Sequence, residues 1–191
     1  ACVFATAHVE ATLLLMDMLE KSGLVTMVGK VSMDTSAPDG LREPDAASAA
    51  RAVRSWLEAA QGRYERTQPM LTPRFIPSCS DALLRELGAI QRESGLPVQS
   101  HLSENRGEVQ LVRELCPWSA FYGAAYDEYG LFGGDGCDTV MAHCVLSEEP
   151  ELELIRERGV YIAHCPASNM NVSSGIAPVR RFLDMGLHTG L

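Results

Sequence analysis

The sequence predicts an α/β fold, an incomplete (β/α)8 barrel with about six strands and the beginning of another. Short apolar runs alternate along the 191 residues with segments in which apolar residues recur at helical spacing. The apolar runs are nearly continuous in Val, Ile, Leu and Ala, which is typical of parallel strands that helices cover. Four of them end on a polar residue, and the active groups of such barrels stand where strands end. These residues are Arg74, His101, His143 and His164.

The elements follow in order along the chain. Strands are expected where apolar and β-branched residues gather, at 2–7, 24–33, 70–75, 97–102, 138–143, 160–164 and 187–191. Helices are expected where the apolar spacing is helical, at 8–23, 44–63, 80–95, 104–115, 147–158 and 176–186. Gly23, Gly95 and Gly159 are expected to end three of these helices, because glycine readily adopts the left-handed conformation that closes a helix.

Three segments are expected to be loops. The segment 33–45 is rich in Pro, Gly and Asp, and the segment 166–175 is rich in Ser and Asn. The aromatic and Gly-rich segment 116–136 is expected to hold a short helix and to cover the site. Ser147 is expected to cap the helix that follows it, because a serine side chain accepts a hydrogen bond from first-turn N–H groups.

The length fits one ordinary domain, but an eight-stranded barrel needs about 250 residues. The chain also begins and ends inside expected strands. Residues 1–191 are therefore expected to form part of one barrel domain whose first and last strands are missing. The longest apolar run, at 11–16, is too short to span a bilayer, and no signal peptide opens the sequence.

Composition argues against several classes of partner. The formal net charge is −9, which argues against binding to nucleic acid or to an anionic membrane, because both need basic patches. The six cysteines lack the C-x-x-C spacing of redox and zinc-ribbon motifs. Several lie in or beside apolar strands, where a free thiol behaves as a small buried hydrophobe. They favour a reducing, cytoplasmic compartment.

His101 and Glu104 form the most specific candidate pair. His101 stands at the end of its strand, and neutral imidazole is a favoured ligand of Zn²⁺ and Fe²⁺. A carboxylate just behind it can reach a substrate bound at such a metal and move protons. Each residue also has a simpler interpretation. His101 alone fits a structural role, and Glu104 fits the first turn of the next helix, where the helix dipole favours acidic residues.

His143 occupies the same position on its strand as His101 does on the preceding one. It is interpreted either as a metal ligand or as a hydrogen-bond partner of the water at the metal. Arg74 has a planar charged group suited to a planar polar heterocycle, on which Phe75 can stack. The alternative for Arg74 is an ion pair with a neighbouring carboxylate. His164 precedes a tight turn and is interpreted as structural.

Six segments carry a resemblance that extends over nearly the whole chain. They are FATAHVEATLLL, VGKVSMD, LTPRFIPSCSDALLRELG, QSHLSENRGEV, TVMAHCVLSEE and RGVYIAHCPASNMNVSSG. With these segments the sequence resembles the amidohydrolase superfamily, and within it the guanine deaminases that are built on a barrel. QSHLSEN together with TPRF is fairly specific to guanine deaminases, whereas HCPASN is shared with other purine and triazine aminohydrolases.

The resemblance implies metal-dependent hydrolytic deamination of guanine to xanthine and ammonia, with one Zn²⁺ or Fe²⁺ ion per subunit. It implies that His101 is a metal ligand that also contacts the substrate, and that Glu104 is the proton shuttle. It makes His143 a ligand or a contact of the water at the metal, and it assigns Arg74 and Phe75 to guanine binding. The intact enzyme is expected to be a homodimer.

The sequence departs from the family pattern at both ends. The H-x-H pair of the family would precede Ala1, and its metal-binding aspartate would follow Leu191 within a few positions. The chain taken alone is therefore expected to be inactive. Two alternatives remain open, a related aminohydrolase that acts on another purine, a pterin or a triazine, and a catalytically dead homologue that serves as a scaffold.

Overall fold

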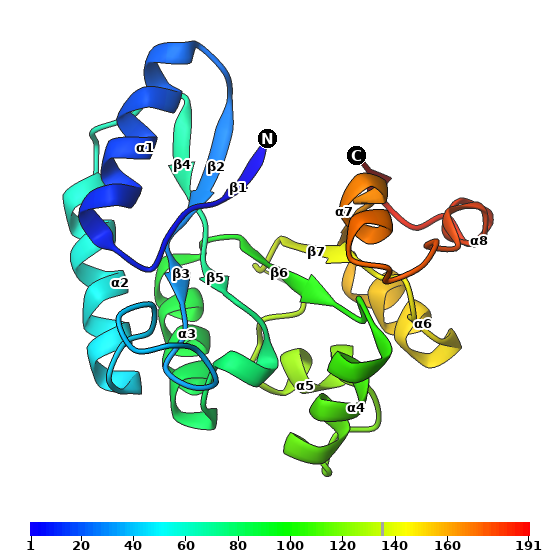
Figure 1. Cartoon of the computed structure of the whole chain (residues 1–191). Helices are drawn as coiled ribbons and strands as arrows, with labels where there is room; N and C mark the ends of the chain where they lie inside the picture. The colour runs from blue at the N-terminus through cyan, green and yellow to red at the C-terminus, as the bar shows by residue number, and fades with distance from the viewer. Residues whose placement is uncertain (135) are drawn as a thin grey trace. The chain divides into compact units, whose positions relative to one another are not determined.

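Parallel strands alternate with helices in the computed structural model, which describes residues 1–134 and 136–191 (Figure 1). The chain divides into two compact units. Unit 1 comprises Ala1–Arg74 and Ser78–Gln99, and unit 2 comprises Phe75–Pro77 and Ser100–Leu191. Across the part of the chain that the structure describes, no helix has both the length and the apolar character needed to cross a membrane.

Unit 1 contains two small parallel sheets and three α-helices. Its strands are β1 (Cys2–Phe4), β2 (Thr26–Gly29), β3 (Val31–Ser32), β4 (Thr67–Pro69) and β5 (Thr72–Pro73). Its α-helices are α1 (Val9–Ser22), α2 (Ala46–Ala60) and α3 (Asp81–Ser94). The strand order is β1-β2-β4 in one sheet and β3-β5 in the other, with parallel pairing in both.

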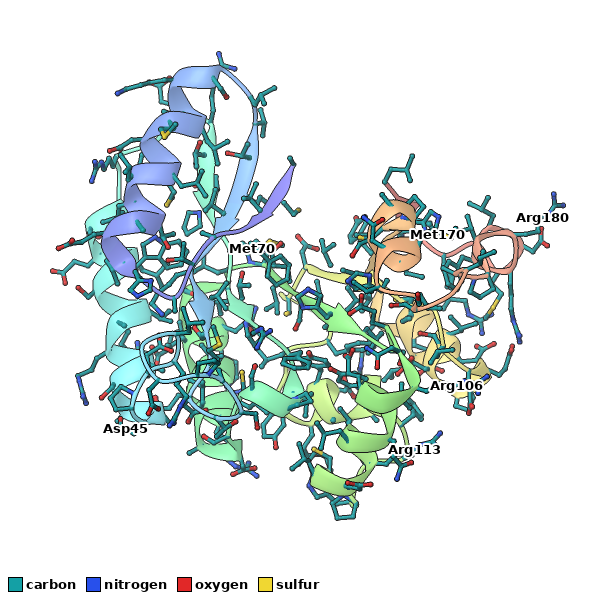
Figure 2. All side chains as sticks on the ribbon, in the orientation of Figure 1. Asp45, Met70, Arg106, Arg113, Met170 and Arg180 are labelled. Carbon is teal, nitrogen blue, oxygen red and sulfur yellow. The ribbon has the colours of Figure 1, made fainter. Side chains whose placement is uncertain are left out.

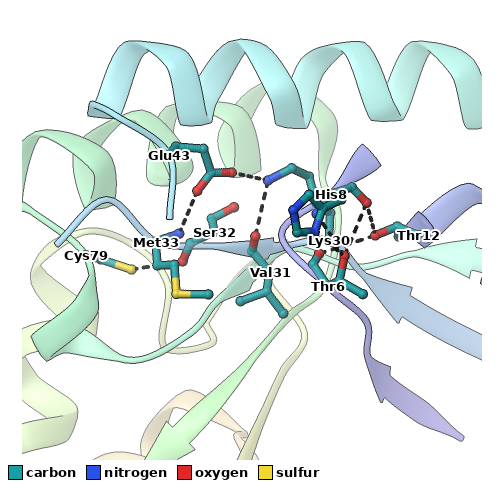
Figure 3. A network of polar contacts seen from close by, with 9 residues as sticks. All are labelled: Thr6, His8, Thr12, Lys30, Val31, Ser32, Met33, Glu43 and Cys79. Carbon is teal, nitrogen blue, oxygen red and sulfur yellow. Dashed lines mark hydrogen bonds and ion pairs between the residues drawn. The ribbon is translucent and has the colours of Figure 1, made fainter. Parts of the chain in front are cut away.

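Two expected strands differ from the prediction, one by being divided and one by being shorter. The segment 24–33 is interrupted at Lys30, whose buried ammonium group binds the Glu43 carboxylate and the Val31 carbonyl oxygen (Figure 3). Within the segment 70–75 only Thr72–Pro73 is a strand, β5, and a further strand that was not expected, β4, precedes the segment at Thr67–Pro69. Apolar composition predicted the approximate location of these strands. It does not predict the residues at which strand pairing is interrupted.

A close approach of backbone to side chain occurs at Gly29. A Cβ atom at this position would lie 1.6 Å from Oγ1 of Thr72, so no residue larger than glycine fits. Nearby, Leu71 forms a parallel bridge with Val98, the first residue of the next strand. The segments that carry Arg74 and His101 at their ends therefore run parallel, as the fold prediction requires.

The core of unit 1 contains residues of α1, α2 and β2. Met16, Val28 and Trp56 are fully buried there, and Ala60 is nearly so. The start of α2 is fixed by Asp45, whose Oδ1 accepts a hydrogen bond of 2.6 Å from the backbone N–H of Ser48 (Figure 2). Such capping satisfies a first-turn N–H that has no partner within the helix. As predicted, α1 and α3 end on glycines in the left-handed conformation.

Unit 2 contains a parallel sheet, and its first strand, β6, begins in unit 1. The strands are β6 (Val98–Leu102), β7 (Thr139–His143), β8 (Tyr161–Ala163) and β9 (Thr189–Gly190), in the order β6-β7-β8-β9. The helices are α4 (Arg106–Leu115), α5 (Tyr122–Glu128), α6 (Glu149–Arg158), α7 (Pro166–Asn171) and α8 (Val179–Asp184). A short 3₁₀ helix, Ile76–Ser78, spans the boundary of the units.

The aromatic segment 116–136 contains α5, the short helix predicted there. Tyr126 of this helix is fully buried and stacks between Tyr122 and Phe132. Its hydroxyl group lies 2.7 Å from Oγ of Ser100 and donates a hydrogen bond of 3.1 Å to the carbonyl oxygen of His101. One buried tyrosine therefore joins this segment to the backbone of β6, directly behind a candidate site residue.

Two predictions about local structure in unit 2 are wrong. Ser147 does not cap α6; it is buried, and Glu148 is the cap, because Pro150 occupies the first turn and sets the helix start. The segment 166–175 is not wholly loop, since its first six residues form α7. Pro166 explains this helix too, because proline has the φ angle of a first helical residue. The helix was not predicted because the Ser and Asn content of the segment is typical of a loop.

The cysteines are free thiols, as expected. Cys79, Cys116, Cys137 and Cys144 are buried, Cys165 is partly buried, and Cys2 is exposed. The prediction that several cysteines behave as small buried hydrophobes is therefore confirmed.

Candidate active site

Neighbouring strands bring His101 and His143 together in unit 2. His101 is the fourth residue of β6 and His143 is the last residue of β7. Their rings are stacked, with centroids 5.3 Å apart and planes inclined by 14°. His143 is buried and His101 is partly buried. The sequence predicted that the two histidines occupy equivalent strand positions, and the structure places their rings in contact.

The backbone where these strands end is unusual. His143 has φ +79° and Cys144 has φ +50°, and after β6 Ser103 has φ +46°. Left-handed conformations of residues other than glycine are uncommon and destabilise the chain by about 1–3 kcal/mol each. Backbone hydrogen bonds stabilise the left-handed conformations at these strand ends. The N–H of Cys144 donates to the carbonyl oxygen of Leu102 over 2.9 Å, and the N–H of Leu146 donates to that of Ser103 over 2.9 Å. Strain of this kind gathers at functional sites.

Glu104 lies beside His143. Its Oε1 is 3.6 Å from Nδ1 of His143 and accepts a hydrogen bond of 3.3 Å from Oγ of Ser174. The side chain is 19% exposed, so solvent still reaches it. Glu104 is not part of the following helix, because α4 begins at Arg106 and Asn105 is its cap. The interpretation of Glu104 as a first-turn residue of that helix is therefore wrong.

Asn169 makes a short polar contact with His143. Its Oδ1 lies 2.7 Å from Nδ1 of His143, and the side chain is 1% exposed. Sequence reasoning treated Asn169 only as part of a loop that shapes the pocket. The HCPASN run is the sequence feature from which a role of Asn169 could have been inferred, because this asparagine follows the end of β8 by a few residues.

His164, Arg74 and Phe75 follow other strands, His164 after β8 and the other two after β5. His164 follows β8, and its backbone N–H donates to the carbonyl oxygen of Gly190 over 2.7 Å. Its Nδ1 is buried and has no hydrogen-bond partner among the described residues. Arg74 follows β5 in unit 1, is exposed, and donates its backbone N–H to the Ser32 carbonyl oxygen over 3.1 Å. Phe75 is partly buried and belongs to unit 2.

Unit 2 also contains two buried carboxyl groups, and sequence reasoning missed both. Glu151 of α6 accepts hydrogen bonds of 2.7 Å from Oγ of Ser103 and from the backbone N–H of Gly123, and burial raises its pKa. The pKa of Glu108 in α4 is raised to about 7, first by burial and then by the charges of Glu104 and Glu151. Hydrophobic patterning gives no sign of either group, because both occupy helix positions where solvated glutamates are usual.

A separate pocket of about 600 Å³ lies in unit 2, lined by residues of α4, α5 and the start of α6. Arg106 and Arg113 of α4 are among its lining residues (Figure 2). The lining includes neither His101 nor His143. This pocket is therefore distinct from the cluster of histidines and Glu104.

The donor groups of this cluster suit a divalent metal in part. Two imidazoles are suitable ligands for Zn²⁺ or Fe²⁺. The amide oxygen at Nδ1 of His143 favours a proton on that nitrogen, so Nε2 carries the lone pair that a metal needs. Within residues 1–134 and 136–191, however, no group of three or more His, Cys, Asp or Glu side chains is placed to hold a metal. The chain supplies part of a ligand set.

The model of the amidohydrolase family matches residues 1–191. The chain belongs to the amidohydrolase family. It is 43% identical to guanine deaminase of Homo sapiens over 194 aligned residues, which cover all of this chain and 42% of that protein. It is 37% identical to a probable guanine deaminase of Schizosaccharomyces pombe, of which it covers 36%. The chain thus spans about two fifths of the length of these relatives.

A solved structure shows the same fold. The guanine deaminase of C. acetobutylicum, with guanine bound in its active site, superposes with a TM-score of 0.94 at 42% identity. The alignment covers 98% of this chain and 44% of that one. The predicted α/β fold with parallel sheets, part of a (β/α)8 barrel, is therefore confirmed.

Proposed function

We propose that the full-length protein catalyses the hydrolytic deamination of guanine to xanthine and ammonia. The observation that carries this proposal is the cluster in which the rings of His101 and His143 stack and Glu104 lies 3.6 Å from His143. Guanine deaminases at 37–43% identity over the whole chain support the choice of substrate. So does the relative of similar fold whose structure contains bound guanine.

One divalent ion per subunit, Zn²⁺ or Fe²⁺, is part of the proposal. When bound, such an ion lowers the pKa of water to about 7 and so supplies a nucleophile at neutral pH. His101 and His143 would hold it, and the remaining ligands would come from parts of the full-length protein outside residues 1–191. Glu104, which is not needed as a ligand, stays available for proton transfer.

Glu104 moves the protons in the proposed reaction. Its carboxylate takes a proton from the attacking water and delivers it to the ring nitrogen next to the amino-bearing carbon. A second proton from the water leaves with the amino group, so that guanine and one water become xanthine and ammonia. The partly exposed setting beside Ser174 suits this role, because the carboxylate is held by a hydrogen bond and a substrate can still reach it.

Arg74, Phe75 and His101 bind the substrate in this proposal. The planar guanidinium group of Arg74 matches the edge of a planar heterocycle, and Phe75 stacks on its face. Correct orientation matters because attack requires the reacting atoms to be about 3–3.5 Å apart and aligned. We also propose a homodimer in a reducing, cytoplasmic compartment, in keeping with the six free thiols.

A substrate panel on the zinc-loaded full-length protein tests the function. Ammonia release is measured with guanine, adenine, a pterin and a triazine, each across a range of concentrations. We expect kcat/KM to be highest for guanine. A higher value for another heterocycle would assign the protein to a different aminohydrolase activity, and zinc binding without turnover of any of them would support a scaffold role.

A further inference from the structure

We propose that Glu151 is a positioning residue that holds the turn carrying Glu104, and that it acts through Ser103. This turn, residues 103–105, lies between β6 and α4. The inference rests on the proposed role of Glu104 in proton transfer, and it assigns to Glu151 an effect on the rate that needs no contact with the substrate.

The carboxylate of Glu151 joins two segments of unit 2. Its Oε2 accepts a hydrogen bond of 2.7 Å from Oγ of Ser103, and its Oε1 accepts one of 2.7 Å from the backbone N–H of Gly123. Glu151 is 2% exposed and Ser103 is 3% exposed, so water hardly competes for these bonds. One buried side chain of α6 therefore ties the turn that carries Glu104 to the start of α5.

Gly123 provides the space that this arrangement needs. Its N–H lies in the first turn of α5, where an N–H group has no partner within the helix, and the cap Phe121 makes no side-chain hydrogen bond. A Cβ atom at Gly123 would lie 2.7 Å from Cζ of Phe132 and 3.3 Å from Cγ of Glu151. The glycine thus lets one carboxylate oxygen bind the backbone of α5, and this bond fixes where the other oxygen meets Ser103.

Ser103 transmits this constraint to Glu104. It has φ +46°, a conformation that a residue other than glycine seldom adopts, and its carbonyl oxygen accepts from the N–H of Leu146 over 2.9 Å. The backbone conformation of Ser103 sets the direction in which the chain continues into Glu104. The Glu104 carboxylate itself accepts a hydrogen bond of 3.3 Å from Ser174, which is longer than either bond of Glu151. The position of Glu104 therefore depends on how firmly the turn is held.

A carboxyl group at position 151 is unfavourable in itself. Burial raises the pKa of Glu151, because the charged form loses its hydration. Leu152 and Ile155 of α6 are also buried, and an apolar residue at position 151 would extend the same core. Such a residue would leave the Ser103 hydroxyl group and the Gly123 N–H without their acceptor. The carboxyl group is therefore explained by the two donors that it joins, one of which directly precedes Glu104.

Steady-state kinetics of the zinc-loaded full-length protein test the proposal. Ser103→Ala removes the bond to the turn and leaves the bond between Glu151 and Gly123 in place. We expect kcat for guanine to fall about 10- to 100-fold, because a displacement of about 1 Å in a reacting group has an effect of this size. KM should stay within about twofold of the wild type, since the lost positioning acts on the transition state, and the zinc content should not change. Thr26→Val is the matched control. It removes a buried hydroxyl hydrogen bond of 3.0 Å to Thr67 in unit 1 and should leave kcat unchanged.

Two variants at position 151 show whether the carboxyl group is the partner that matters. Glu151→Gln keeps a polar group for both contacts, because its amide oxygen accepts from Gly123 and its NH₂ group donates to the Ser103 hydroxyl oxygen. Its kcat should stay within about threefold of the wild type. Glu151→Met removes both bonds and should be at least as slow as Ser103→Ala. Combining the two should add less than about a twofold loss, since both break the same bond. Ser103→Ala and Glu151→Gln carry the test if Glu151→Met does not fold.

Hydrogen exchange of the Leu146 amide monitors the turn without any turnover. Because this N–H bonds to the Ser103 carbonyl oxygen, it should exchange faster in Ser103→Ala and at the wild-type rate in Glu151→Gln and Thr26→Val. Unchanged kcat or unchanged Leu146 exchange in Ser103→Ala overturns the inference, and so does an equal loss of kcat in Thr26→Val. The proposed function fails in a different way. A wild-type protein that holds zinc and releases no ammonia from guanine loses the assigned substrate, and Leu146 exchange still decides whether Glu151 holds the turn.

Discussion

The carboxylate of Glu104 lies 3.6 Å from Nδ1 of His143, although the two residues are 39 positions apart in the sequence. The turn after β6 places Glu104 there, because Ser103 adopts a left-handed conformation and Asn105 takes the capping position of α4. Glu104 is thus held between a strained residue and a helix cap. Its location follows from the strand end rather than from the helix, which is the arrangement expected of a group that acts on a substrate.

The first prediction isolates the proton-transfer role of Glu104. In the full-length protein, Glu104→Gln should leave the zinc content nearly unchanged, because Glu104 is not proposed as a ligand. The rate of guanine deamination should fall by about 10²–10⁴-fold, the range for loss of a general acid–base group. Metal analysis and turnover measured on the same preparation check this.

His101→Ala is the companion variant of this experiment. It should lose zinc as well as activity, so the two variants are inactive for different reasons. If Glu104→Gln keeps more than about a tenth of the wild-type rate, well above the range for a lost acid–base group, Glu104 has no part in proton transfer.

The second prediction concerns residues 1–191 produced alone. This chain should bind zinc weakly and show negligible deamination of guanine, because protein zinc sites normally use three or four protein ligands. The described residues bring only two candidate histidines together. Equilibrium dialysis against zinc and an ammonia assay measure the two properties. Stoichiometric, tightly bound zinc would contradict the prediction and would require ligands other than His101 and His143.

The sequence predicted the alternation of strands and helices because burial imposes a period on the residues. The stacked pair His101 and His143 was foreseeable for the same reason, since equivalent positions on neighbouring parallel strands lie at one edge of a sheet. Helix ends marked by Gly23, Gly95 and Gly159 were also predicted, because they depend on the backbone freedom of a single residue.

Contacts between residues that are far apart in sequence were not foreseeable from a pattern. Asn169 contacts His143, 26 positions away in the sequence. The composition of the segment 166–175 that contains Asn169 predicted only a loop. The burial of Glu108 and Glu151 depends on three helices meeting, and each glutamate looks like a solvated residue in its own helix. The cap of α6 was misassigned because serine is a favoured capping residue, whereas Pro150 in the first turn sets the helix start after Glu148, which makes no side-chain capping hydrogen bond.

The third prediction is a pH dependence of stability that arises from Glu108. Burial is the largest cause of its raised pKa, which is about 7 compared with an ordinary value of 4.5. Between these two values the folded protein binds a proton that the unfolded chain has released. Stability therefore falls as pH rises from about 4.5 to about 7 and stays lower above that range. A shift of this size corresponds to ~3 kcal/mol, because one pKa unit equals about 1.36 kcal/mol.

Glu108→Gln removes this dependence. The variant should gain unfolding free energy relative to the wild type as pH rises, by ~3 kcal/mol between pH 4.5 and pH 8. Thermal or urea unfolding of the full-length protein at both pH values measures the difference. Glu114→Gln is the control, because Glu114 is exposed on the same helix, α4. A difference between Glu108→Gln and the wild type that does not change with pH would show that Glu108 titrates normally.

The fourth prediction concerns the buried ion pair of Lys30 and Glu43 in unit 1. Lys30 is 1% exposed, and its ammonium group binds Oε1 of Glu43 and, at 3.2 Å, the carbonyl oxygen of Val31 (Figure 3). Oε2 of Glu43 accepts a hydrogen bond of 3.2 Å from the backbone N–H of Met33. The pair therefore fixes the loop that follows β3 as well as neutralising a buried charge.

Breaking this pair from one side should be far more harmful than removing it entirely. Glu43→Gln leaves the Lys30 ammonium group buried without its counter-charge, and the unfolding free energy should fall by about 3–5 kcal/mol. The double variant Lys30→Met with Glu43→Leu should recover most of that loss, since apolar replacement of a buried pair is often neutral or stabilising.

Arg54→Ala is the control. It removes an exposed pair with Glu93 in the same unit, and exposed pairs contribute about 0–1 kcal/mol. Urea unfolding of all three variants gives the comparison. A loss in Glu43→Gln no larger than in Arg54→Ala would mean that solvent reaches the Lys30 ammonium group.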